Sequence, residues 1–369
     1  MVIQEILLHL NLIEDIGPAT ILKILNACKN QELHLLYRMN ANDLKEYFKC
    51  SDFIAGKIVQ GLCDKKILEQ ELELIKKNNI QVSTICDETY PELLRHINYP
   101  PIILYIKGQS LEVFKKNIAI VGARKANFYG QRVVNQIVPD LVKNDFTIVS
   151  GGAIGLDTMA HSATLAANGK TVAVLGSGLL QPYPSSNKKL FENIVQDGGS
   201  IVSSFPLNAG AFPENFPARN RIIAGLSHGC VVVQANIKSG ALITAKFALD
   251  QAREVFAVPG HIDDELSSGC HWLISQGATL VSSTQDILYA FGILPQKETK
   301  LQDQKAEQTS IIDEDSLEHK IIKLCRKAVS FDEILDVAQI DVSNLQNTLF
   351  QMQMDGKIEQ NFAGLWQAI

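Results

Sequence analysis

Basic and glycine-rich residues follow two short apolar runs that lie about one βαβ unit apart in the chain. The first run ends in VGARK and the second in SGG. Because the carboxyl ends of parallel strands meet at one edge of a sheet, we expect both turns to open into one crevice. Arginine, lysine and unpaired backbone amides all bind phosphate, so the pattern predicts an anion site. Its expected residues are Arg124, Lys125, Ser150, Gly151 and Gly152.

The first of these turns lacks the features of a dinucleotide site. No G-x-G-x-x-G motif follows the apolar run. The pattern therefore indicates an anionic ligand other than a dinucleotide.

Two further basic turns continue the same rhythm. The run FPARNRIIAG places two arginines and an asparagine before an apolar stretch, and KSGALITAK follows the strand-like VVV. Helix N-termini attract anions, and a guanidinium grips phosphate with two hydrogen bonds. Taken alone, the arginine turn also fits a capped helix whose arginines pair with carboxylates. Together the turns predict a long basic groove for a chain of phosphates, and they add Arg219, Asn220, Arg221, Lys238, Ser239, Gly240 and Lys246 to the expected site.

Two aromatic residues near the same edge, Phe128 and Phe212, could contact nucleic acid. Aromatic rings that stack on bases are typical of proteins that bind unpaired strands. A packing role is the commoner explanation for either ring. Phe212 is included among the candidate DNA contacts.

The net charge of the chain is unevenly distributed. The whole chain carries a formal −6, yet residues 115–261 contain fourteen Lys or Arg and eight Asp or Glu, a balance of +6. A basic centre between acidic arms suits a polyanion bound at one site. An uneven surface without a function is the alternative.

The cysteines and the N-terminus indicate a cytoplasmic protein. Seven cysteines form no C-x-x-C pair and are odd in number, which favours idle thiols in a reducing compartment and makes a zinc site unexpected. We expect no other metal or cofactor. The N-terminus lacks a basic region and a cleavage site, and no apolar run approaches the roughly 20 residues of a membrane span.

Apolar spacing divides the chain into five segments. Residues 1–65 show helical periodicity, and residues 66–116 lead into the core. In residues 117–295, β-branched runs that end in small residues alternate with helical stretches, which predicts a doubly wound, mainly parallel Rossmann-like α/β sheet. Residues 296–315 are charged and aperiodic, and they indicate a flexible linker.

Residues 316–369 predict three helices and a terminal β-hairpin, which is the element order of a winged helix. A transcription regulator is therefore a further class to weigh. The expected third helix, residues 341–355, contains no Lys or Arg, whereas helices that read DNA need cations for the phosphates. A protein contact is the better explanation for this domain.

Seven runs together resemble the DNA-processing protein A family, also called DprA or Smf. They are VGARKANFYG, SGGAIGLD, AVLGSGLLQPYP, FPARNRIIAGLS, SGALITAKFAL, VFAVPG and LISQGA. The resemblance extends over essentially the whole chain. The two ends are similar to the family's N-terminal sterile-alpha-motif-like module and its C-terminal winged helix, and IGPA at residues 16–19 also resembles half of a helix-hairpin-helix motif.

This resemblance implies sequence-independent binding of single-stranded DNA. It also implies a homodimer formed through the Rossmann-like domain, and loading of the RecA recombinase onto incoming strands in natural transformation. The family's phosphate-gripping arginine matches Arg124, and its other basic turns match residues 219–221 and 238–240. At Lys125, where a second arginine is usual, the charge is kept without the guanidinium fork.

A nucleotide-processing hydrolase is the alternative function, because related Rossmann-like proteins include nucleoside-monophosphate phosphoribohydrolases. Those enzymes use a P-G-G-x-G-T-x-x-E turn, whereas residues 238–244 contain no carboxylate. Asp157 and His161 lie one helical turn apart and could form an acid/base pair, but Asp157 is better explained as a cap of the helix that follows. We therefore expect a binding protein rather than an enzyme.

Overall fold

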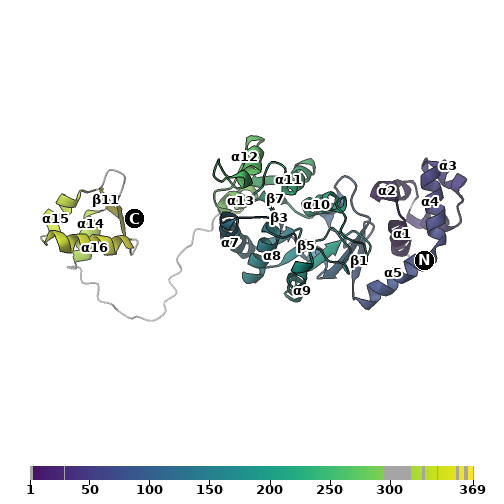
Figure 1. The fold of residues 1–369 in the computed structure, drawn as a ribbon, viewed down its shortest axis with the longest axis horizontal. Coiled ribbons are helices and arrows are strands. Elements are labelled where there is room, and N and C mark those ends of the chain that lie inside the picture. The colour runs from purple at the N-terminus through teal and green to yellow at the C-terminus, as the bar shows by residue number, and fades with distance from the viewer. Residues whose placement is uncertain are drawn as a thin grey trace. The chain divides into compact units, whose positions relative to one another are not determined.

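The computed structural model describes residues 3–28, 30–294, 317–325, 329–338, 340–354, 357–360 and 365–368. The chain divides into two compact units, Met1–Pro295 and Gln296–Ile369 (Figure 1). The predicted linker at residues 296–315 lies outside the described residues.

A nine-stranded sheet forms the centre of the first unit, in the order β1-β2-β6-β5-β4-β3-β7-β8-β9. All neighbours from β6 to β9 pair in parallel, whereas β2 pairs antiparallel with both β6 and β1. The predicted, mainly parallel sheet is confirmed, and the lead-in segment adds two strands to its edge. The strands are β1 (Gln81–Thr84), β2 (Ile103–Gly108), β3 (Asn117–Val121), β4 (Thr147–Ser150), β5 (Thr171–Val174), β6 (Ser200–Ser203), β7 (Gly229–Val232), β8 (Glu254–Ala257) and β9 (Thr279–Leu280).

Helices cover both faces of this sheet because successive strand residues enter opposite apolar layers. Ala119 and Val121 pack on the side of α10, α11 and α12, whereas Ile118 and Ile120 pack on the side of α7, α8 and α13 (Figure 1). The doubly wound arrangement is thereby confirmed. The helices are α6 (Glu92–Arg95), α7 (Phe128–Lys143), α8 (Leu156–Ala166), α9 (Lys188–Gln196), α10 (Asn215–Gly225), α11 (Gly240–Asp250), α12 (Ser268–Ser275) and α13 (Thr284–Ala290), with short 3-10 turns at Leu111–Val113, Ser185–Asn187 and Glu265–Ser267.

The direction of winding reverses between β3 and β7, which are neighbours in the sheet. From β3 the chain winds outward through β4 and β5 to β6, and from β7 it winds the other way through β8 to β9. In open α/β sheets a crevice opens at such a reversal, outside the carboxyl ends of the strands. The fold therefore places the ends of β3 and β7 at the position where ligands bind.

The N-terminal helices share an apolar core with the sheet. Ile6 and Leu7 belong to the same buried cluster as Tyr105 and Phe191, and the Glu71 carboxylate accepts a hydrogen bond from the Leu207 amide at 2.8 Å. The segment is helical, and its assignment to a sterile-alpha-motif-like or helix-hairpin-helix-like module stays a prediction. The elements are α1 (Ile3–Leu12), α2 (Pro18–Ala27), a 3-10 helix (Asn30–Tyr37), α3 (Ala41–Phe48), α4 (Asp52–Cys63) and α5 (Lys65–Lys77).

Within its described residues, the second unit contains three helices and a two-stranded antiparallel sheet around a small core. This is the predicted order of elements, and the assignment to a winged helix stays a prediction. Its elements are α14 (Leu317–Leu324), α15 (Phe331–Ala338), α16 (Val342–Met354), β10 (Ile358–Gln360) and β11 (Trp366–Ala368). No helix in the described parts of either unit combines the length and the apolar composition that crossing a bilayer requires.

Candidate nucleic-acid interface

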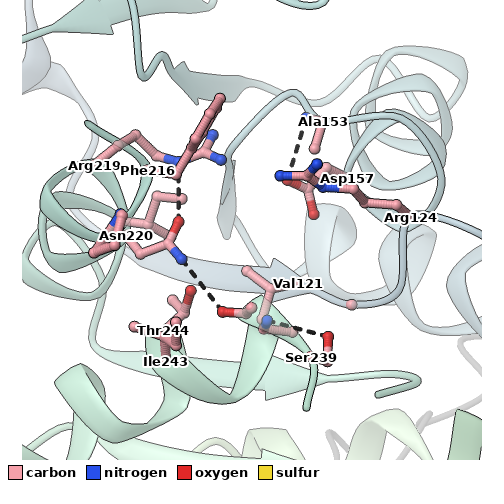
Figure 2. Close-up of a pocket in the computed structure, with 15 residues that line it drawn as sticks. Val121, Arg124, Ala153, Asp157, Phe216, Arg219, Asn220, Ser239, Ile243 and Thr244 are labelled. Atoms are coloured by element: carbon pink, nitrogen blue, oxygen red, sulfur yellow. Dashed lines mark hydrogen bonds between the residues drawn. The ribbon is translucent and has the colours of Figure 1, made fainter. Parts of the chain in front are cut away.

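A pocket of about 300 Å³ lies at the reversal point, between the ends of β3 and β7. Figure 2 shows Arg124 and Asp157 on one side of it and Phe216, Arg219 and Asn220 on another. The pocket thus gathers residues from the end of β3, the start of α8, α10 and the start of α11, at the carboxyl edge of the sheet. Its lining consists of Val121, Gly122, Arg124, Ala153, Asp157, Phe216, Pro217, Arg219, Asn220, Ile223, Ser239, Gly240, Ala241, Ile243 and Thr244.

Arg124 follows β3 and carries an exposed guanidinium at this pocket. The guanidinium carbon lies 5.5 Å from the centre of the Phe216 ring. Among the described residues no carboxylate forms an ion pair with it. An exposed arginine that rests on an aromatic face keeps its hydrogen-bond donors available for a ligand. The position expected for Arg124 from the sequence is therefore the one observed.

Arg219 lies at the same pocket but is only 5% exposed. Its Nε donates to the Asn220 Oδ1 at 3.0 Å, and its Nη1 donates to the carbonyl oxygens of Val174, at 2.9 Å, and Gly151. These bonds join α10 to the ends of β4 and β5. Arg219 thus forms part of the buried wall rather than the free phosphate fork that the sequence suggested.

The glycine turn after β4 differs from the expected phosphate cradle. The amides of Gly151 and Ala153 both donate to the Asp157 Oδ2, at 3.1 and 3.3 Å. The hydroxyl of Ser150 is buried and donates to the Ile120 carbonyl at 2.6 Å. Gly152 has a φ of +66°, and its buried carbonyl accepts from Asn187. The Ser150 hydroxyl and the Gly151 amide are thus engaged within the protein and are not free donors for a ligand.

Asp157 and His161 do not form the acid/base pair that their spacing allowed. The Asp157 carboxylate bonds the turn before α8, not the helix N-terminus itself as expected, and burial raises its pKa although Arg219 opposes the shift. His161 is fully buried, and its Nδ1 lies 2.7 Å from the Thr171 Oγ1. Burial lowers the pKa of His161 to about 3. A histidine that stays neutral and out of the pocket is poorly placed for general acid/base catalysis.

The start of α11 provides the opposite wall. The Ser239 Oγ caps the helix by accepting from the Ala241 amide at 3.2 Å. The Gly240 carbonyl accepts from the Asn220 Nδ2 at 3.3 Å, and space around the Gly240 Cα is open. The Thr244 hydroxyl belongs to a side chain that is 1% exposed and lines the pocket. Ser239, Gly240 and Asn220 are therefore brought together as predicted.

Four of the expected cations and one expected ring lie outside the pocket lining. Arg221 follows Arg219 by two residues on α10, which turns it by about 200° toward Tyr90. Lys125, Lys238 and Lys246 are exposed and do not line the pocket. Phe212 is also exposed, and it precedes α10 in the chain.

Sequence reasoning missed two aromatic residues of the site. Phe216 lies under both arginines, since its ring is 5.7 Å from the Arg219 guanidinium carbon as well. Tyr183 is half exposed, lies 6.0 Å from the Phe216 ring, and lines a small adjoining hollow with Arg124. Phe216 stands inside the FPARNR run, so its position next to two arginines was an available signal; QPYP around Tyr183 gave none.

The described residues contain no cluster of three or more His, Cys, Asp or Glu side chains arranged to hold a metal ion. Cys230 and Cys270 are buried, and burial raises the pKa of each thiol to about 12. Neither thiol is therefore ionised near neutral pH.

A family sequence model described as DNA recombination-mediator protein A matches residues 81–292. The chain is 41% identical over 225 residues to protein Smf of Escherichia coli, which covers 61% of this chain and 60% of that protein. It is 44% identical over 209 residues to the DNA processing protein DprA of Streptococcus pneumoniae, covering 56% and 73%. The matched region is thus narrower than the whole-chain resemblance expected from the sequence.

The solved structures that share the fold include two DNA processing proteins. The X-ray structure of DprA from Streptococcus pneumoniae aligns with a TM-score of 0.68 at 35% identity, covering 77% of this chain and 97% of that one. DNA processing protein A from Helicobacter pylori, whose structure concerns its single-stranded DNA binding mode, aligns with a TM-score of 0.52 at 29% identity, covering 58% and 97%.

Proposed function

Since the chain belongs to the DNA recombination-mediator protein A family, we propose that it binds single-stranded DNA along the carboxyl edge of its sheet and processes DNA for recombination. The observation that carries this proposal is the guanidinium of Arg124, exposed at a pocket where the winding of the sheet reverses. The single-stranded DNA binding named for the Helicobacter pylori relative supports it.

The shape and lining of the pocket favour an unpaired strand over a duplex. Ile223 and Ile243 supply apolar walls, and the Thr244 hydroxyl lies among them, whereas the Asn220 amide is bonded to Arg219 and Gly240. A duplex keeps its bases stacked and paired, and only a single strand can present a base face to such a surface. The exposed ring of Phe212 suits the same ligand.

Further roles follow from family membership as parts of this proposal. A recombination mediator acts by placing a recombinase on single-stranded DNA, which makes the RecA recombinase the proposed partner in natural transformation. A homodimer would join two such pockets and increase the apparent affinity for a strand that reaches both.

A mobility-shift comparison of single-stranded and double-stranded DNA of equal length tests the central proposal. The single strand is expected to bind much more tightly, and log affinity is expected to fall with log salt by roughly 0.7 per phosphate contacted. Equal affinity for duplex, or affinity that does not change with salt, contradicts the proposal.

The hydrolase alternative has a separate test. Purified protein is expected to release neither base nor phosphate from nucleoside monophosphates, because the carboxylate of Asp157 is already engaged by two backbone amides. Turnover that disappears in an Asp157→Asn variant would establish the alternative instead.

A further inference from the structure

The turn between β4 and α8 is built like an anion site that already holds an anion. Two backbone amides, those of Gly151 and Ala153, point at a single oxygen of Asp157. Converging amides that precede a helix are the usual receptor for a phosphate or sulfate. Here the acceptor is a carboxylate from the first turn of the helix itself.

Packing around this turn holds the carboxylate in place. A Cβ atom at position 151 would clash with both the Arg219 guanidinium and the Asp157 carboxylate, so only glycine allows the three groups to meet. Asp157 is 7% exposed and Arg219 is 5% exposed, and the positive charge of Arg219 acts on the carboxylate. A buried carboxylate needs this combination of hydrogen bonds and an opposite charge.

The filled anion position opens onto the candidate ligand site. Asp157 and Ala153 both line the 300 Å³ pocket, as does Arg219. Figure 2 shows the Asp157 carboxylate on the Arg124 side of that space. Removing the carboxylate would therefore join the two amides to the pocket and leave the Arg219 charge without its counter-ion.

We propose that Asp157 is a built-in anion that fills the phosphate position of the glycine turn and thereby excludes small phosphates from the pocket. Inorganic phosphate and free mononucleotides then find no receptor there, and a ligand must be held by Arg124 at the exposed side. This inference rests on the proposed DNA-binding function, because it explains how the same pocket selects a polymeric strand over free nucleotides.

The test measures the melting temperature of wild type and Asp157→Ala in potassium phosphate and in potassium chloride of equal ionic strength. A ligand that binds only the folded state raises the melting temperature as its concentration grows. Phosphate is expected to stabilise Asp157→Ala beyond chloride and to leave the wild type unchanged. Titration calorimetry is expected to give at least tenfold tighter phosphate binding for the variant. Equal responses of the two proteins overturn the proposal.

Asp157→Asn is the matched control. Its amide oxygen can still accept from both backbone amides, because a single oxygen does so in the wild type. The melting temperature of the asparagine variant is therefore expected to be the same in phosphate as in chloride, although the variant has lost the charge. A phosphate response as large as that of Asp157→Ala would show that charge alone excludes the ligand, and it contradicts the filling proposed here.

A refolding measurement and a DNA-binding measurement serve as further controls. If Asp157→Ala does not fold in chloride, the readout becomes refolding yield in phosphate or formate against chloride, and equal yields in all three salts overturn the proposal.

Binding of single-stranded DNA by the wild type is measured in parallel. A wild type that binds the strand while Asp157→Ala ignores phosphate sinks only this inference, whereas no strand binding sinks the proposed function.

Discussion

Two hollows lie at opposite ends of the parallel strands, and both contain cations. The pocket at the carboxyl edge holds Arg124 and Arg219. The hollow at the amino edge, about 610 Å³ in volume, is lined by Lys115, Lys116 and Lys170 among other residues. By charge alone the amino edge is the richer site for an anion.

The helix ends around the two hollows reverse that ranking. The amino-edge hollow is bordered by the C-terminal ends of α7, α8 and α9, which carry the negative ends of the helix dipoles. Lys170 donates to the Asp197 carbonyl at 2.6 Å, at the end of α9. Lys170 thus interacts with a carbonyl of the protein itself. At the carboxyl edge the helices begin, so a cation adds to the field that an anion meets.

The largest expected difference between variants at the two edges is in the free energy of unfolding. Arg219→Ala leaves the Asp157 carboxylate buried without its opposite charge, and it is expected to lower the free energy of unfolding by about 3 to 5 kcal/mol. Lys170→Ala removes one exposed hydrogen bond at a helix end and is expected to cost about 1 kcal/mol or less. Urea denaturation of both variants measures the two values. Similar losses of stability in the two variants would contradict the expectation that the buried Arg219 contributes more to folding than the exposed Lys170.

The next difference concerns DNA. Arg124→Ala removes an exposed guanidinium at the pocket and is expected to weaken single-strand binding by about 1.5 to 3 kcal/mol, roughly tenfold or more. Lys116→Ala, the matched change at the amino edge, is expected to leave affinity within about twofold, since that edge presents carbonyls to the ligand.

Arg124→Lys serves as the intermediate case. It restores the charge without the two-pronged hydrogen bonding, so only part of the affinity is expected to return. Salt titrations with a single-stranded oligonucleotide compare the three variants with wild type. If Lys116→Ala weakens binding as strongly as Arg124→Ala, the strand follows the amino edge and the assignment of the two hollows is reversed.

Lowering the pH is expected to reduce the free energy of unfolding, through a buried histidine in the core between the two edges of the sheet. His161 on α8 contacts Thr171, the first residue of β5, and burial lowers its pKa from 6.5 to about 3. The unfolded chain binds a proton below pH 6.5 that the folded chain refuses, so stability is full above that pH and is lost as pH falls toward 3. The slope for one such group is about 1.4 kcal/mol per pH unit.

Denaturation midpoints between pH 7 and pH 5 measure this effect. The pKa of His9 is also lowered by burial, so His161→Gln is expected to reduce the slope rather than abolish it. An unchanged slope in that variant would show that His161 binds a proton as readily in the folded protein as in the unfolded chain.

The strand ends are predictable from sequence because each β-branched run stops at a small residue. That rule alone puts Arg124 just after a strand, and this strand, β3, lies at the reversal of the sheet. The rule does not predict which groups near the strand ends have hydrogen-bond donors free for a ligand. Gly151 looks like a phosphate donor in the sequence, but its amide is engaged by Asp157, a contact that depends on how the turn folds back.

Helix geometry explains the other misplacements. Arg219 and Arg221 were grouped because they are close in sequence, whereas a helix directs them to different sides. The positive balance of residues 115–261 likewise includes Lys116 and Lys170, which lie at the amino edge and not at the carboxyl edge where Arg124 lies. Sequence therefore predicts the edge where chemistry gathers better than it predicts the state of each side chain there.

The smallest expected effect belongs to the second unit. If the carboxyl edge of the sheet is sufficient for the strand, a chain that ends at Pro295 should bind single-stranded DNA within tenfold of the full chain, a difference under about 1.4 kcal/mol. Residues 316–369 contain five Lys or Arg against seven Asp or Glu, so they bring no net positive charge to phosphates. Residues 1–295 form a compact unit with their own core, so the shortened chain is expected to fold, which a thermal melt checks. A well-folded shortened chain that loses more than tenfold in affinity would place a second DNA contact after Pro295, and the comparison of the two sheet edges would then describe only part of the binding surface.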